Sequence, residues 1–107
     1  MVNLVTTGAK SGQQRVTPII AIPDGKNIIL IASNYGKTKL PAWYHNLKAN
    51  PRASLVQKGQ LKTYRVYEAT GPELDRYWRL ADEAYLGYQE YRKRAGRDIP
   101  IMVLVPE

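Results

Sequence analysis

The chain has 107 residues, a length that suits one compact domain and leaves no room for a separate catalytic module. It contains no cysteine and a single histidine, His45, which excludes disulfides and cysteine nucleophiles and argues against metal sites. The lack of cysteine also suits a reducing cytoplasm. Sixteen lysines and arginines against nine acidic residues give a net charge of +7, which favours an anionic partner.

Short strands separated by turn signals dominate the pattern. Strands are predicted over residues 4–7, 15–23, 28–33, 53–57, 61–69 and 100–105, and helices over residues 41–49, from residue 70 onward and over residues 88–95. The third strand is apolar on both faces, which indicates a central position in a sheet. Six short strands with one helical excursion between the third and the fourth predict a mainly β domain with helices, built as a small barrel.

Local signals mark turns and helix starts. Asp24-Gly25 and Lys58-Gly59-Gln60 are typical of hairpin turns, because such turns need residues that accept a positive φ. Pro41 fits the first turn of a helix, and residues 70–73 have the spacing of a capping box. The buried face predicted for the helix that follows consists of Leu74, Tyr77, Trp78, Ala81 and Tyr85.

A polar loop between the first two strands is the first candidate site. Its two glycines let backbone N–H groups turn toward a ligand, Lys10 and Arg15 add charge from opposite ends, and Ser11 and Gln13 add neutral donors. Several donors in a concave loop, together with cations, are what a phosphate group needs. The glycine spacing differs from that of a Walker loop. The alternative is a solvated hairpin loop that happens to be basic.

Two further stretches follow the central strand. Ser33 ends that strand, where side chains often reach a site, although its surroundings are not those of a nucleophilic serine. In the next predicted helix Trp43 and Leu47 share one face, while Asn46 and Asn50 share another. For both stretches the alternative is a purely structural role, as the end of a strand or as part of the core.

Three tyrosines near the C-terminus form the fourth candidate. Tyr85, Tyr88 and Tyr91 are three residues apart, with Gly87 between the first two. At helical spacing their hydroxyls would line one wall, where they could orient a flat polar substrate or donate a proton. Ordinary helix packing is the alternative, although a helix broken by glycine is a poor core helix.

Together these stretches resemble the deazaflavin-dependent nitroreductase family, also described as coenzyme F420-dependent quinone reductases of mycobacteria and other actinobacteria. Order and spacing match along nearly the whole chain. The matching elements are TTGAKSGQQRV at residues 6–16, DG at 24–25, IAS at 31–33, PAWYHNLKANP at 41–51, YLGYQEY at 85–91 and IPI at 99–101.

The resemblance implies a split β-barrel of the flavin-reductase and FMN-binding type, as a single domain over residues 1–107. Such proteins bind the reduced deazaflavin coenzyme F420 and pass a hydride from its ring to a quinone, an enone or a nitro compound. The coenzyme is a small polyanion, which agrees with the net charge of +7. The protein would supply orientation and electrostatics rather than the reactive group.

The resemblance also implies roles for individual residues. Lys10 and Arg15 would hold the coenzyme phosphate, with Ser11 and Gln13 assisting. The remaining coenzyme contacts implied are Pro18, Ala32, Ser33, Asn34, Trp43 and Asn46. The acceptor side, which is also the catalytic set, would consist of Ser33, Tyr85, Tyr88 and Tyr91.

Two positions depart from the family pattern. Ile20 stands where the best-known nitroreductase has a tyrosine, and Asn34 stands where it has a lysine, so reduction of nitroimidazoles is left open. Relatives carry a helical segment ahead of the first strand, and here that segment is expected to be absent. It could contact the inner face of the cell membrane, so the expected location is cytoplasmic with or without peripheral membrane contact. Split barrels commonly pair, which makes a homodimer one expectation.

Other functions stay open on the residues alone. An FMN-dependent split-barrel reductase is the first alternative, because related barrels use that cofactor. A nucleic-acid-binding barrel with stacking tyrosines is the second, but no basic stripe is interleaved with aromatics on adjacent predicted strands, so we expect no nucleic acid partner. A non-catalytic carrier of the coenzyme is the third.

Overall fold

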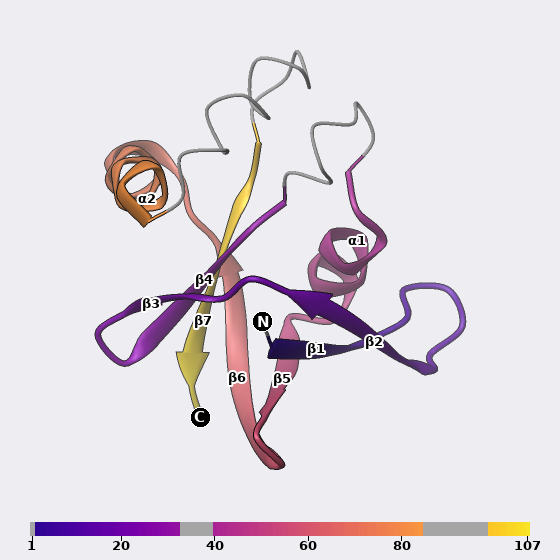
Figure 1. Ribbon diagram of the computed structural model, residues 1–107. Coiled ribbons are helices and arrows are strands. Elements are labelled where there is room, and N and C mark those ends of the chain that lie inside the picture. Colours follow the sequence, from indigo (N-terminus) through magenta and orange to yellow (C-terminus); the bar gives the residue numbers. More distant parts are fainter. Residues whose placement is uncertain (1, 33–39, 85–98) are drawn as a thin grey trace.

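The computed structural model describes residues 2–32, 40–84 and 99–107. Within these residues the chain forms seven strands and two helices (Figure 1). In chain order they are β1 (Val2–Thr7), β2 (Gln14–Ile19), β3 (Ile22–Asp24), β4 (Asn27–Ile31), α1 (Ala42–Ala49), β5 (Arg52–Gln57), β6 (Gln60–Glu68), α2 (Gly71–Ala84) and β7 (Ile101–Pro106).

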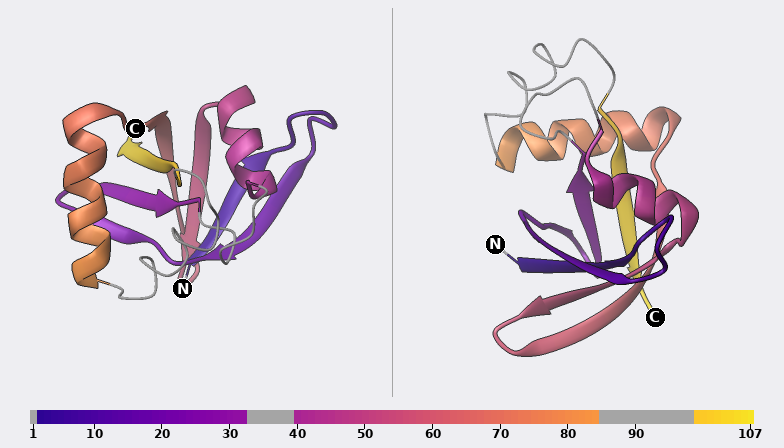
Figure 2. Two further views of the ribbon diagram at one scale, coloured as in Figure 1. Left: turned by 90° about the horizontal axis from the view of Figure 1, so that it is seen from above. Right: turned by 90° about the vertical axis from the view of Figure 1, so that its right-hand side faces the viewer.

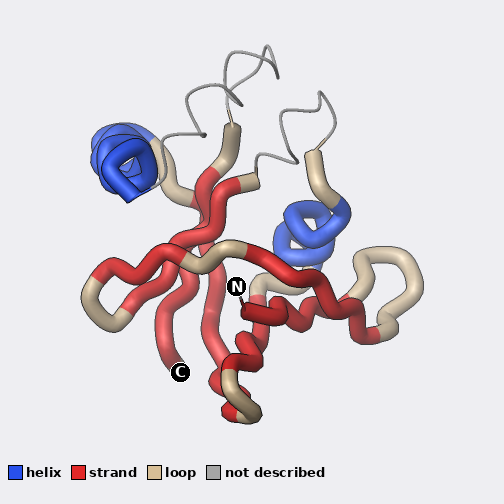
Figure 3. The backbone as a smooth tube through the Cα atoms, in the orientation of Figure 1, coloured by secondary structure: helices blue, strands red, loops and turns tan. Residues whose placement is uncertain are grey.

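All seven described strands belong to one antiparallel sheet, in the order β2-β1-β5-β6-β7-β4-β3. The edge strands β2 and β3 are consecutive in the chain and are separated only by Ile20 and Ala21. The sheet therefore has to curl until its two edges approach each other, and the strands surround a barrel-like interior (Figure 3).

The bend between β2 and β3 corrects the single strand predicted over residues 15–23. β2 pairs with β1 at one edge of the sheet and β3 pairs with β4 at the other, so the backbone has to change partners between them. The buried residues form two clusters, one beneath α2 that includes Tyr77, Trp78 and Val103, and one in the barrel interior. At the bend, Ile20 packs against the cluster beneath α2 and Ala21 packs against the barrel-interior cluster. The apolar pattern continues through the bend, so the sequence carries no local mark of it.

Both predicted hairpins are present, but the central turn residues are displaced. In the first hairpin Asp24 belongs to β3, and the turn consists of Gly25, with a φ of +61°, and Lys26. In the second hairpin Lys58 and Gly59 form the turn with φ values of +51° and +77°. Two consecutive positive φ values are what a type I′ turn requires.

Both faces of β4 and β7 are buried. Leu30 and Met102 belong to the barrel-interior cluster, whereas Ile29 and Val103, their neighbours in the chain, belong to the cluster beneath α2. The central position predicted from two apolar faces is therefore confirmed. The barrel-interior cluster consists of Leu4, Leu30, Ala32, Trp43, Leu47, Ala53, Leu55, Tyr64, Val66, Met102 and Leu104.

The two described helices lie on different sides of the strands (Figure 2). α2 begins at the predicted capping segment and buries Tyr77, Trp78 and Ala81 as expected, whereas Leu74 is only half-buried. Tyr85 and the helix predicted over residues 88–95 lie outside the described residues. α1 begins directly after Pro41. Neither helix combines the length and the hydrophobicity needed to cross a membrane.

Candidate functional site

The β1–β2 loop, residues 8–13, is folded back on itself by its own hydrogen bonds. The N–H of Gly8 donates to the carbonyl of Gln13 at 2.7 Å, and the N–H of Gly12 donates to the carbonyl of Gly8 at 3.0 Å. The N–H of Gln13 also donates to Oγ of Ser11 at 3.2 Å. The loop therefore has a defined shape even though most of its side chains are exposed.

Two glycines permit this shape for different reasons. A Cβ atom on Gly8 would lie 2.5 Å from Oγ of Ser11 and 3.2 Å from the carbonyl oxygen of Gln13, so the loop packs too closely for a side chain there. Gly12 has open space around it but a φ of +69°, which residues with a side chain rarely adopt. The loop needs glycine at both positions.

Asn46 on α1 fastens the loop to the body of the protein. Its Oδ1 accepts a hydrogen bond from the N–H of Ala9 at 3.0 Å, and its Nδ2 donates to Oγ1 of Thr6 on β1 at 3.1 Å. Both Thr6 and Asn46 are buried. One amide thus joins a helix, a strand and the loop, a role that the sequence analysis missed.

Fewer backbone N–H groups of the β1–β2 loop are free to bind a ligand than its two glycines predict. The prediction that several loop N–H groups turn toward a ligand is wrong for most of the loop, because four of its six N–H groups maintain its shape. Those four belong to Gly8, Ala9, Gly12 and Gln13. The N–H groups of Lys10 and Ser11 have no acceptor among the residues that the structure describes.

Lys10 and Arg15 give the loop an unneutralised positive charge. Both side chains are exposed, and neither pairs with an acid in the described part of the chain. Arg15 lies opposite Thr6 in the β1–β2 register, on the sheet face that Asn46 contacts. Its Nε lies 3.8 Å from the position of a Cβ on Gly8, so the guanidinium group leans over the base of the loop. Two free cations beside two free N–H groups fit a phosphodiester.

Of the other predicted coenzyme contacts, the structure describes Pro18, Ala32, Trp43 and Asn46. Ala32 and Trp43 belong to the barrel-interior cluster, with exposed fractions of 0% and 7%. Pro18 is exposed and lies three positions from Arg15, which puts the two side chains on opposite faces of β2. Among these four described residues, Asn46 is the one that hydrogen-bonds to the β1–β2 loop, through the N–H of Ala9.

The predicted acceptor side falls outside the described residues. Its members Ser33, Tyr85, Tyr88 and Tyr91 lie in the segments 33–39 and 85–98, as does the predicted coenzyme contact Asn34. Their roles stay predictions.

A hydrogen bond from Tyr44 holds α1 against β6. The hydroxyl donates to Oε1 of Glu68 at 2.6 Å, and Nζ of Lys48 lies 3.4 Å from the same oxygen. Burial, followed by the hydrogen bond to the Glu68 carboxylate, raises the pKa of Tyr44 to about 12. The neutral phenol is therefore the stable form, and the helix that carries Asn46 is tied to the sheet.

Comparison with known proteins identifies the family. A family model described as F420H(2)-dependent quinone reductase matches residues 1–106. The chain belongs to this family. An F420H(2)-dependent quinone reductase of Mycobacterium tuberculosis is 36% identical over 105 residues, which make up 94% of this chain and 70% of that protein. The resemblance inferred from the sequence motifs is therefore confirmed.

Solved structures agree with the family. A structure described as an F420-H2 dependent reductase (FDR-A) has a TM-score of 0.86 and 36% identity, covering 96% of this chain and 91% of that one. A structure described as a domain-swapped dimer has a TM-score of 0.87 and 36% identity, covering 96% of this chain and 78% of that one. The expected split β-barrel fold is confirmed.

Proposed function

We propose that this chain is an oxidoreductase that transfers a hydride from reduced coenzyme F420 to a quinone-like acceptor, with enones and nitro compounds as further acceptors. Membership of the F420H(2)-dependent quinone reductase family supports both the coenzyme and the reaction. The observation that carries the assignment in this chain is the β1–β2 loop, where unpaired Lys10 and Arg15 meet a backbone held in shape by Asn46.

In this proposal the loop binds the phosphodiester of the coenzyme. Lys10 and Arg15 neutralise its charge, and the Ser11 hydroxyl, which accepts from the N–H of Gln13, keeps its own proton free to donate. The Gln13 side chain, which is exposed, assists from the rim of the loop. The bound coenzyme supplies the hydride, and the protein binds and orients it.

A fluorescence titration with oxidised coenzyme F420 tests the proposal. The wild type should bind it more tightly than FMN at the same salt concentration, and Lys10→Ala combined with Arg15→Ala should weaken binding at least tenfold, since two charge-assisted contacts are lost. A matched control, Lys26→Ala combined with Arg65→Ala, removes two exposed cations elsewhere and should bind as the wild type does.

Each of the other outcomes of these experiments would favour a different interpretation. Equal weakening in both double variants would reduce the effect to overall charge and remove the loop from the site. Tight FMN binding without coenzyme F420 binding would move the protein to the flavin-dependent alternative. Binding without oxidation of the reduced coenzyme by a quinone such as menadione would indicate a carrier.

We also propose that the chain forms a homodimer, because a neighbour of 36% identity is described as a domain-swapped dimer. Light scattering after size-exclusion chromatography should give twice the mass of the chain, and a monomeric mass would contradict the proposal. Peripheral membrane contact and a cytoplasmic location stay predictions, since they depend on more than the described residues.

A further inference from the structure

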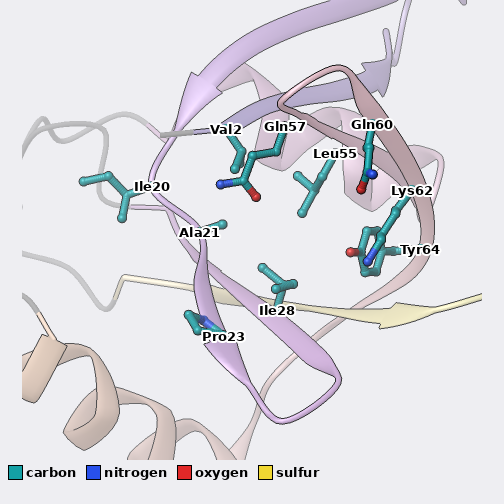
Figure 4. A pocket seen from close by; sticks show the side chains of 10 residues that line it. All are labelled: Val2, Ile20, Ala21, Pro23, Ile28, Leu55, Gln57, Gln60, Lys62 and Tyr64. Atoms are coloured by element: carbon teal, nitrogen blue, oxygen red, sulfur yellow. The ribbon is translucent and has the colours of Figure 1, made fainter.

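The barrel opens near the tip of the β5–β6 hairpin into a cavity of about 400 Å³, which we call the barrel mouth (Figure 4). Its walls come from the start of β1, the bend between β2 and β3, β4 and the β5–β6 hairpin. None of the residues assigned to the coenzyme phosphate is among the described residues that line it. A volume of this size is within the range of small-molecule sites, roughly 300–1,000 Å³.

Strand register explains why polar side chains point into the barrel mouth. Leu55 pairs with Lys62 and Gln57 pairs with Gln60, and directly paired residues share a face of the sheet. Because side chains alternate along β6, Gln60, Lys62 and Tyr64 all lie on this inner face. The wall therefore changes from polar at the hairpin tip to apolar toward the interior, where Leu55 and Tyr64 belong to the core cluster.

Two polar groups of the barrel mouth have no protein partner. Tyr64 is only 7% exposed, yet its hydroxyl forms no hydrogen bond with the residues that the structure describes. Lys62 forms no ion pair within the described part of the chain. Lys62 is exposed and solvent reaches the Tyr64 hydroxyl, so both groups are available to a ligand at the opening of the cavity. A ligand that accepts hydrogen bonds would satisfy both.

We propose that the barrel mouth binds a small amphiphile that carries one carboxylate group. The carboxylate accepts hydrogen bonds from the Lys62 ammonium and the Tyr64 hydroxyl, with two glutamine amides at the rim, and the apolar part lies against Ile28 and Leu55. The described lining residues include one cation and no acid, which matches a single negative charge. A doubly charged phosphate monoester would leave one negative charge uncompensated, and a cationic amphiphile would be repelled by the Lys62 ammonium group.

Decanoate below its micellar concentration is a direct probe, with the decyltrimethylammonium cation as its opposite in charge. Methyl chemical shifts followed by NMR should move at Ile28 and Leu55 with decanoate and not with the cation. Lys62→Met should weaken decanoate binding about tenfold or more, and Tyr64→Phe should weaken it about 2- to 10-fold, in line with loss of a charged and a neutral hydrogen bond. Thermal melting would establish that each variant is folded.

The control variant is Arg65→Met, which removes a charge from the same strand at an exposed position on its other face. It should leave decanoate affinity unchanged, as should Lys10→Ala combined with Arg15→Ala. The proposal would be overturned by an absence of methyl shifts with decanoate, by equal binding of the cation, or by an unchanged affinity in folded Lys62→Met. Loss of decanoate binding in the Lys10 and Arg15 variant would also overturn it, because the carboxylate would then bind at the β1–β2 loop.

Discussion

Replacing Asn46 with alanine should reduce both stability and coenzyme affinity, because one buried amide serves two partners. Without its Nδ2 donor, the Thr6 hydroxyl loses its partner at a position only 2% exposed, and an unpaired buried polar group costs about 1–3 kcal/mol. The N–H of Ala9 lies in an exposed loop and can bond to water instead, so its bond contributes about 0.5–1.5 kcal/mol. The sum, about 1.5–4.5 kcal/mol, lowers the midpoint of thermal unfolding by on the order of 10 °C.

Only the bond to Ala9 bears directly on the coenzyme. Once it is lost, the loop has to be ordered during binding, and an ordering cost equal to that bond corresponds to an increase of about 2- to 12-fold in Kd. Thr6→Val separates the two effects, since it removes the hydroxyl and leaves the bond between Asn46 and Ala9 in place. It should be destabilised by about 1–3 kcal/mol while binding the coenzyme as the wild type does.

Thermal unfolding and fluorescence titration of the same preparations, at one salt concentration, measure both quantities. Asn50→Ala is a matched control, because Asn50 is an exposed asparagine just beyond the end of the same helix. It should change neither quantity. Equal weakening of coenzyme binding in Asn46→Ala and Thr6→Val, or wild-type affinity in Asn46→Ala, would refute the view that loop anchoring governs affinity.

Two further predictions follow from the close packing of the loop and from the titration of α1. Gly8→Ala should weaken coenzyme binding and destabilise the fold by about 1–3 kcal/mol, because its Cβ would lie 2.5 Å from Oγ of Ser11. Adding Ser11→Ala should restore part of the stability, and no recovery of stability would contradict this account of the clash. The pKa of Tyr44 is about 12 in the folded protein and 10.0 ordinarily, so the unfolded chain loses the phenol proton at a lower pH than the folded chain does. The stability that the neutral phenol contributes is therefore complete below pH 10 and is lost as the pH rises to 12. Tyr44→Phe should therefore make the fall of the unfolding free energy across that window shallower in urea titrations, and identical slopes would disprove the assignment.

Local signals predicted most of the strands and both hairpins, because each depends on neighbouring residues. The continuous apolar runs of β4 and β7 reflect two buried faces, and Gly25 and Gly59 supply positive φ values that the hairpin turns need. The break at Ile20 and Ala21 could not be predicted in this way. It follows from pairing with β1 on one side and β4 on the other, which no window of the sequence contains.

The sequence indicates which residue types gather at the candidate site, but it does not indicate how their side chains are arranged. Lys10 and Arg15 stand out in the sequence as candidates because their charge and their glycine-rich surroundings are local features. The role of Asn46 depends on partners 37 and 40 residues away, and a buried asparagine within a helix looks the same in sequence whether it contacts a ligand or the protein. Lys62 was overlooked for the opposite reason, since a lysine in an alternating strand ordinarily marks the solvated face.

The position of α1 links the stability of the barrel to the shape of the site. On one side of the helix, Trp43 and Leu47 are buried in the barrel-interior cluster, and between them in the chain Asn46 reaches the β1–β2 loop. Tyr44 ties the same helix to β6 through Glu68. Any shift of α1 large enough to break a hydrogen bond of 3.0 Å would therefore also disturb buried side chains in a close-packed interior, which resists such shifts. The loop thus derives its shape from its own hydrogen bonds and its fixed position from the core through Asn46. This allows a short, exposed and glycine-rich segment to present its cations in a fixed arrangement.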